Sequence, residues 1–138
     1  MKRLMSLAIA CAVFGGEVSA ENYGYECRVK TASAQLGWLP EFLFIGHDVD
    51  KEEVTVSDPI ILRYNSRKPV RGKLVRDNAS RSTFAWEVKT RDRSGQRATI
   101  KYRATYLKAS GKLSISANPL GYGNNFVGGG RCEKKPIK

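Results

Sequence analysis

The sequence predicts an all-β protein: a single small antiparallel barrel, or a barrel-like sandwich, of about eight strands. Short runs that alternate apolar and polar residues recur along the chain, with turn-forming residues between them. No apolar pattern of helical period extends beyond a turn or two. Two cysteines near the two ends, Cys27 and Cys132, would tie the first strand to the last if they pair.

The first twenty of the 138 residues have the features of a cleaved secretory signal. A basic start is followed by an apolar run over residues 4–14 and by small residues at 18–20. This run is too short for a membrane anchor, which needs about 20 apolar residues. We expect cleavage near Ala20, leaving residues 21–138 as a single all-β domain with a short basic C-terminal tail, without a transmembrane segment, in the periplasm or secreted. A lipoprotein anchored at Cys11 is the disfavoured alternative, because the residues before this cysteine lack the expected leucine-like side chain.

Removal of the signal would leave Cys27 and Cys132 as the remaining cysteines, and an oxidising compartment favours their pairing. Such a bond closes a loop of about 100 residues and, through the entropy of the unfolded chain, would stabilise the fold by about 4 to 5 kcal/mol. It also requires the first and last strands to be neighbours.

The clearest strand signal covers residues 82–107, a β-hairpin that turns at residues 92–95. Side chains two residues apart share a face of a strand, so one face of this hairpin is apolar. The residues predicted to face the core are Phe84, Trp86, Val88, Ile100, Tyr102, Ala104 and Tyr106. A second hairpin turns at residues 109–111 into a strand over 112–117, with Leu113, Ile115 and Ala117 on one face.

The other strands are predicted from shorter patterns. Residues 23–31 and 70–76 alternate, and residues 42–45 form a continuous apolar run that predicts a strand buried on both faces. Residues 54–56 and 60–64 are predicted as short strands on either side of a turn at Asp58-Pro59. The last strand, residues 126–132, contains three consecutive glycines, where backbone can approach closely.

The chain has 24 basic and 13 acidic residues, for a net charge of +11. The charge is uneven: residues 21–60 carry eight acids and three bases, whereas residues 61–138 carry 19 bases and four acids. Clustered cations attract anions in a salt-dependent way. The residues predicted to form an anion-binding surface are Arg71, Lys73, Lys89, Arg91, Lys101 and Arg103. We therefore expect a binding module that contacts an anionic envelope polymer, a lipid headgroup or an acidic protein. Export disfavours nucleic acid.

Catalysis finds little support in the residue types present. His47 is the only histidine, which excludes a histidine zinc cluster, and its place beside acids predicts an exposed loop. The acidic stretch over residues 48–53 suggests a calcium site or a pair of catalytic carboxylates, but a solvated loop is the favoured interpretation. We expect no catalytic residues, no metal and no cofactor.

Two alternative binding functions remain open. The barrel mouth of a lipocalin-like carrier would hold a small apolar ligand between Trp38, Phe42, Trp86 and Tyr122. The arrangement of Tyr25-Glu26-Cys27 on an early strand and Gly130-Arg131-Cys132 on a late one also resembles small periplasmic barrels that include inhibitors of C-type lysozyme. This resemblance covers the layout alone, because the loop signatures of that family are missing, and it implies a periplasmic inhibitor of a cell-wall hydrolase without assigning residues.

Overall fold

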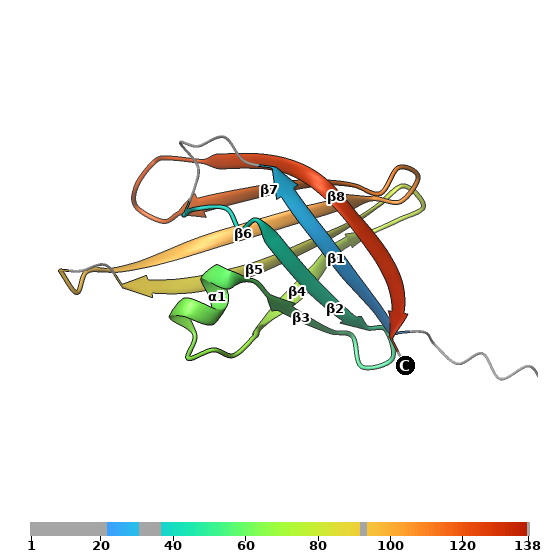
Figure 1. The fold of residues 1–138 in the computed structure, drawn as a ribbon, viewed down its shortest axis with the longest axis horizontal. Helices are drawn as coiled ribbons and strands as arrows, with labels where there is room; N and C mark the ends of the chain where they lie inside the picture. Colours follow the sequence, from blue (N-terminus) through green and yellow to red (C-terminus); the bar gives the residue numbers. More distant parts are fainter. Residues whose placement is uncertain (1–21, 31–36, 92–93, 138) are drawn as a thin grey trace, which may run out of the picture.

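A computed structural model describes residues 22–30, 37–91 and 94–137 and shows a closed barrel of eight antiparallel strands (Figure 1). Each strand pairs with its neighbours in the chain, and the last pairs with the first, so the predicted fold class is confirmed. The strands are β1 Asn22–Lys30, β2 Phe42–Asp48, β3 Glu53–Ser57, β4 Val70–Asp77, β5 Arg81–Arg91, β6 Arg97–Leu107, β7 Lys112–Pro119 and β8 Phe126–Ile137. The predicted signal segment lies outside the described residues.

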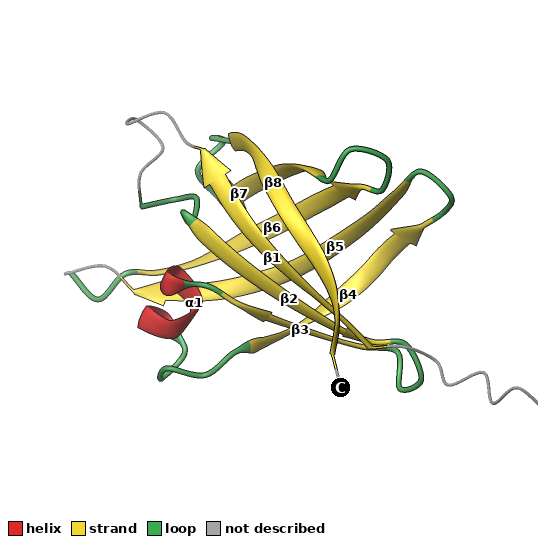
Figure 2. Cartoon of the chain, turned by 45° about the vertical axis from the view of Figure 1, so that its right-hand side comes forward, coloured by secondary structure: helices red, strands yellow, loops and turns green. Residues whose placement is uncertain are grey.

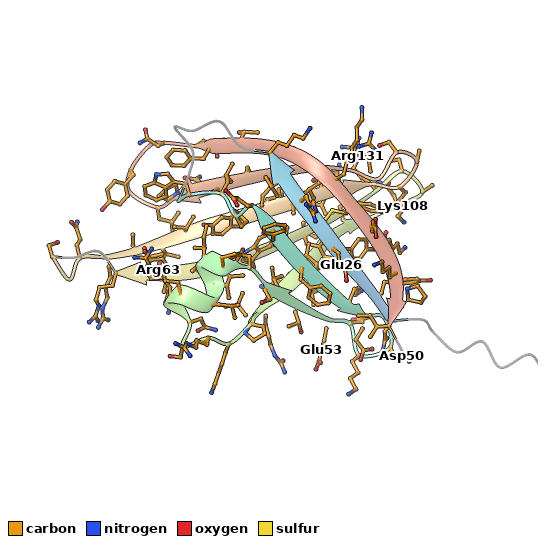
Figure 3. All side chains as sticks on the ribbon, in the orientation of Figure 1. Glu26, Asp50, Glu53, Arg63, Lys108 and Arg131 are labelled. Atoms are coloured by element: carbon orange, nitrogen blue, oxygen red, sulfur yellow. A yellow bond between two sulfur atoms is a disulfide. The ribbon has the colours of Figure 1, made fainter. Side chains whose placement is uncertain are left out.

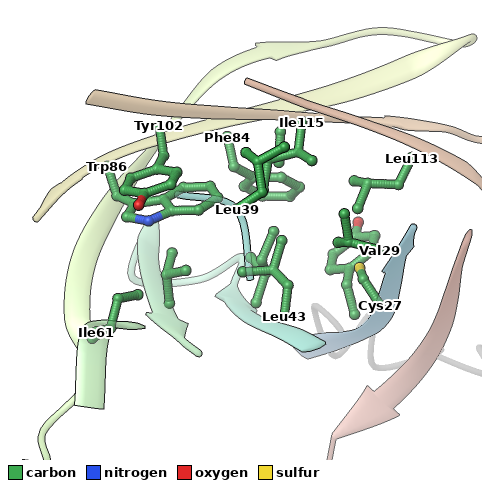
Figure 4. Close-up of a cluster of buried hydrophobic side chains, with 14 of the residues drawn as sticks. Cys27, Val29, Leu39, Leu43, Ile61, Phe84, Trp86, Tyr102, Leu113 and Ile115 are labelled. Atoms are coloured by element: carbon green, nitrogen blue, oxygen red, sulfur yellow. The ribbon is translucent and has the colours of Figure 1, made fainter. Parts of the chain in front are cut away.

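The interior is filled by the alternate side chains that the sequence pattern predicts. All seven predicted core residues of the β5–β6 hairpin are buried, as are the three from β7. Figure 4 shows the aromatic rings of this core packed together, with Trp86 stacked on Tyr102 at a centroid distance of 5.4 Å. Tyr25 meets Phe84 and Tyr106 edge-on at 5.2 and 5.1 Å. Side chains therefore pack the centre of the barrel.

The disulfide between Cys27 and Cys132 lies on the seam that closes the barrel. The two residues are direct partners in the β1–β8 register, their sulfurs are 2.03 Å apart and their Cα atoms are 3.9 Å apart. The predicted pairing is confirmed.

A short helix replaces one predicted strand. Residues 60–64 belong to α1, Pro59–Tyr64, so the prediction of a strand there is wrong. Asp58 caps this helix: its Oδ1 accepts a 2.7 Å hydrogen bond from the Ile61 N–H, and Pro59 takes the first helical position, where proline needs no N–H partner. Ile61 is buried in the core, and α1 lies in the connection between β3 and β4, at one end of the barrel (Figure 2). It is the one helix among the described residues, and it is too short to cross a bilayer.

The apolar run at the start of β2 is buried on one face only, so its predicted burial on both faces is wrong. Leu43 and Ile45 point inward, whereas Phe42 and Phe44 are 51% and 39% exposed on the outside of the barrel. Continuous apolarity here reflects an apolar outer surface as well as a core face.

One of the three glycines of β8, Gly130, allows this strand to approach the backbone of β1. A Cβ atom at Gly130 would overlap the main-chain carbonyl oxygen of Arg28, and one at Gly128 would lie 2.9 Å from Cδ1 of Leu39. The close backbone approach predicted for this run is therefore present at the closing seam.

Candidate anion-binding wall and barrel mouth

The six predicted anion-binding residues all lie on the outer face of three adjacent strands, β4, β5 and β6. Each is exposed to solvent, and Arg97 on β6 joins them. We name this surface the basic wall and define it by Arg71, Lys73, Lys89, Arg91, Arg97, Lys101 and Arg103. Alternation along β6 already puts Arg97 on the same face as Lys101 and Arg103, and the pairing of β5 with β6 brings it beside Arg91.

The strand register sets the spacing of the cations. Lys73 pairs with Ala85, and Ala85 pairs with Arg103, so the two cations lie on either side of one small residue. Neighbouring strands are about 4.8 Å apart, so the Cα atoms of Lys73 and Arg103, which are two strands apart, are separated by about 10 Å. Residues on one face of a strand follow each other at about 6.7 Å. The wall is therefore a grid of positive charges rather than a single cluster.

The grid continues to the end of the β5–β6 hairpin. Lys89 pairs with Thr99 one step along, and Arg91 pairs directly with Arg97 at the last described register position. Two guanidinium groups side by side repel each other in the free protein, so an anion between them would relieve this repulsion. The end of the hairpin therefore brings two cations of the wall together at paired register positions.

Few acids neutralise the wall. Glu87 lies 3.9 Å from Lys101 and Glu53 lies 3.8 Å from Arg71, but all four side chains are largely exposed, so these ion pairs hold little energy. Within the described residues, the other five cations of the wall form no ion pair. Their charges are available to a ligand.

The neutral residues between the cations are small or polar. Ala85 and Thr99 lie inside the wall, and Ser116 and Asn118 on β7 pair with Arg103 and Lys101 at its border. Of the large apolar side chains on β4, β5 and β6, Val75 alone is exposed. Such a surface suits hydrated anions.

The opposite wall, formed by β8, β1 and β2, has a different character. Glu26 pairs with Glu133 and Arg28 with Arg131 across the seam, and Lys135 lies 3.1 and 3.3 Å from the two carboxylates. Figure 3 shows Glu26 and Arg131 on this side of the barrel. A groove of about 740 Å³ lies over these residues, with Phe42 and Phe44 along it. Positive charge is thus not confined to the basic wall, but here acids balance most of it.

A second hollow, of about 400 Å³, opens at the end of the barrel where the β5–β6 hairpin turns. Its aromatic lining consists of Trp38, Tyr64, Tyr122 and Phe126, and Arg91 of the basic wall also borders it. The Trp38 and Phe126 rings stack at 4.8 Å with an interplanar angle of 9°. We name this hollow the barrel mouth.

The four residues predicted to hold an apolar ligand do not share one cavity. Trp38 and Tyr122 border the barrel mouth. Trp86 is only 3% exposed inside the core, and Phe42 lies outside on the opposite wall, so their predicted place at the mouth is wrong. Tyr64 was missed because it lies on the helix that was predicted as a strand, and Phe126 because a loop separates it from Tyr122.

The other candidate sites suggested by the sequence are a metal site, the acidic stretch over residues 48–53 and His47. Among the described residues, no group of three or more His, Cys, Asp or Glu side chains is placed to hold a metal ion. The acidic stretch forms the turn between β2 and β3, where Asp48 accepts a 3.1 Å hydrogen bond from the Lys51 N–H. His47 is half-buried in β2 rather than in the predicted exposed loop. Its ring lies 6.0 Å from Phe84, and burial lowers its pKa.

These features define a class: a small disulfide-closed antiparallel barrel with one cationic outer wall and an aromatic mouth. Comparison with protein families, with curated proteins and with solved structures gives no match.

Proposed function

We propose that the protein is a non-enzymatic binding module that holds an anionic polymer against the basic wall, outside the cytoplasm. The observation that carries this proposal is the grid of cations on β4, β5 and β6, spaced by the strand register, in which five of the seven form no ion pair with any described residue. A chain with repeated negative charges can meet several of these cations at once, and each contact adds to its affinity.

A polymer fits this wall better than a membrane surface does. Proteins that bind lipid surfaces combine cations with apolar side chains that enter the headgroup region. The basic wall has small and polar residues between its cations, and exposes Val75 alone among large apolar side chains of β4, β5 and β6. The wall is also curved around the barrel, so a flexible chain can follow it, whereas a flat bilayer would touch fewer of the cations.

The location is part of the same proposal. The disulfide is expected in an oxidising compartment, such as the periplasm or the extracellular space. Envelope and extracellular polymers with carboxylate or phosphate groups are the anionic macromolecules available there, and this favours such a polymer over nucleic acid.

The experiment compares two double variants of equal charge. Lys73→Glu with Arg103→Glu changes the basic wall, and Arg28→Glu with Arg131→Glu makes the same change in net charge at exposed positions of the opposite wall. We expect binding to polyphosphate, measured by calorimetry, to weaken at least about tenfold in the wall variant and by less than about threefold in the control. Binding by the unchanged protein should disappear near about 0.5 M salt.

Equal losses in the two variants would show that net charge alone attracts the polymer, and would overturn the assignment to the wall. Binding that survives high salt would overturn the electrostatic basis altogether. Circular dichroism of each variant checks that the barrel is intact before binding is compared.

A further inference from the structure

We infer that the barrel mouth is a sugar-binding subsite, so that the anionic polymer is a polysaccharide whose rings bear acidic groups. This inference rests on the proposed function, because the mouth and the basic wall share Arg91. It adds a chemical class of ligand that positive charge alone does not specify.

Aromatic rings line the mouth. Trp38 and Phe126 stack on each other and form one side of the hollow. Tyr64 and Tyr122 border the same hollow and are 37% and 48% exposed, respectively. Neither tyrosine belongs to the buried core cluster, whereas the buried Ile100 and Pro119 line the same hollow. Exposed rings grouped around a hollow are typical of a site for a ligand with an apolar face.

Polar side chains also line the mouth. Thr90, Asn124 and the Arg91 guanidinium border the hollow together with the aromatic rings. The Thr90 hydroxyl donates a 3.3 Å hydrogen bond to the Ala98 carbonyl, which leaves its oxygen able to accept. A sugar ring offers an apolar C–H face to an aromatic ring and hydroxyl groups at its edge, so it matches a hollow that combines aromatic rings, hydroxyl, amide and guanidinium groups. A purely apolar ligand would remove these polar groups from water and offer them no hydrogen bond in return.

The local backbone holds Tyr122 at the rim. Gly121 and Gly123 on either side of it have φ values of +85° and +61°, a conformation that favours glycine. The Tyr122 N–H donates a 3.3 Å hydrogen bond to the Pro119 carbonyl at the end of β7. The tight turn therefore presents the Tyr122 ring to solvent beside the hollow.

The mouth is continuous with the basic wall through Arg91. Arg91 borders the mouth and pairs with Arg97 at the end of the wall, so an acidic group on a bound sugar would lie close to both guanidinium groups. The volume of about 400 Å³ lies in the range of about 300 to 1,000 Å³ usual for small-ligand sites. One part of an acidic polysaccharide can thus occupy the mouth while the rest of the chain follows the wall.

The test compares polymers with and without sugar rings. Polygalacturonate, alginate and hyaluronate carry acidic sugars, whereas polyphosphate carries charge alone. We expect Tyr122→Ala to weaken binding to at least one of the three polysaccharides by about fivefold or more, and to leave polyphosphate binding within about twofold. Tyr122→Phe keeps the ring and should retain most of the affinity. The wall variant Lys73→Glu with Arg103→Glu should weaken binding to all four polymers.

Nuclear magnetic resonance provides a second readout. The protein has two tryptophans, Trp38 at the mouth and Trp86 in the core. Binding of a polysaccharide should shift the Trp38 indole signal and leave that of Trp86 nearly unchanged, whereas polyphosphate should shift neither.

The possible failures are distinct. If Tyr122→Ala leaves all polysaccharides unaffected, or weakens polysaccharides and polyphosphate equally, the sugar subsite is overturned and binding along the wall stands. If neither polysaccharide nor polyphosphate binds the unchanged protein, the proposed function fails, and the subsite fails with it.

Discussion

The hydroxyl of Tyr102 donates a 2.8 Å hydrogen bond to the main-chain carbonyl of Trp38, 64 residues earlier in the sequence. Tyr102 is a buried residue of β6, and Trp38 borders the barrel mouth. This bond therefore attaches the segment that carries Trp38 to the packed interior, and burial of the hydroxyl raises the pKa of Tyr102 well above its ordinary value.

Replacement of Tyr102 by phenylalanine should remove this bond while the stacked ring remains. We expect the free energy of unfolding to fall by about 1 kcal/mol, because a partly buried carbonyl loses its partner. Urea denaturation measures the loss, and the Trp38 indole signal should shift. Tyr106→Phe is the control, since the Tyr106 hydroxyl makes no hydrogen bond within the described chain; it should cost less than about 0.5 kcal/mol. Equal costs would show that the bond contributes nothing specific.

Two adjacent glycines of β8 should differ sharply in their tolerance of a methyl group. A Cβ at Gly130 would overlap the Arg28 carbonyl on β1, whereas the nearest atom to a Cβ at Gly129 is the Leu113 carbonyl oxygen, 3.5 Å away. Gly130→Ala should therefore destabilise the barrel by more than about 3 kcal/mol or prevent its folding, and Gly129→Ala should cost less than about 1 kcal/mol. Thermal unfolding of the two variants provides the comparison. Similar melting temperatures would contradict the close approach of β8 to β1.

Reduction of the Cys27–Cys132 bond should lower stability strongly, because the two residues are 105 positions apart in the sequence. Release of a loop of this length restores entropy to the unfolded chain and should cost about 4 to 5 kcal/mol. The double variant Cys27→Ala with Cys132→Ala should melt at a similar temperature to the reduced protein. If the melting temperature of the variant instead equals that of the oxidised protein, the disulfide contributes nothing to the stability of the seam.

Asp58 should make stability depend on pH. Burial raises its pKa from 3.8 to about 6, while the hydrogen bond from the Ile61 N–H acts in the opposite direction. Between about pH 4 and pH 6 the unfolded carboxyl is ionised while the folded one keeps its proton. The free energy of unfolding should thus fall as pH rises through this window, by roughly 3 kcal/mol at most, and stay level above it.

Two variants separate the charge of Asp58 from its role as a helix cap. Asp58→Asn keeps an oxygen for the cap and cannot ionise, so its stability relative to the unchanged protein should be higher at pH 8 than at pH 4. Asp58→Ala removes the cap and should already cost about 1 kcal/mol at pH 4. Chemical denaturation at both pH values measures these differences. An Asp58→Asn effect that does not vary with pH would contradict the raised pKa.

The sequence predicts the barrel well where one face of a strand is apolar and the other polar. Alternation alone assigns the inward residues of β5, β6 and β7, and two cysteines near the ends predict the closing seam. Alternation does not predict the burial of Phe42–Ile45 or the helix at Ile60–Tyr64, because the apolar residues there are consecutive and define no period. The helix start was present as a signal, Asp58 followed by Pro59, but the same pair is also typical of a turn.

The candidate site is less predictable, because its geometry depends on pairing between strands. The cations of β4, β5 and β6 are visible in the sequence, but the placement of Lys73 and Arg103 on either side of Ala85 follows from the register. A bulge between Leu74 and Arg76 shifts the β4–β5 register, and no local sequence pattern predicts this bulge. The mouth likewise combines residues from three separate parts of the chain: Trp38, Tyr64, and the neighbouring Tyr122 and Phe126.

The pairing of β8 with β1 also determines the order in which the molecule can be completed. Every other strand pair joins neighbours in the sequence, so hairpins can form as the chain emerges, but β1 finds its second partner only when residues 126–137 exist. Until then the growing sheet has two open edges with unpaired backbone groups. Ribosome-bound chains stalled before residue 126 should therefore remain sensitive to proteases along β1, and the protected, oxidised product should appear only once residues 126–137 have emerged.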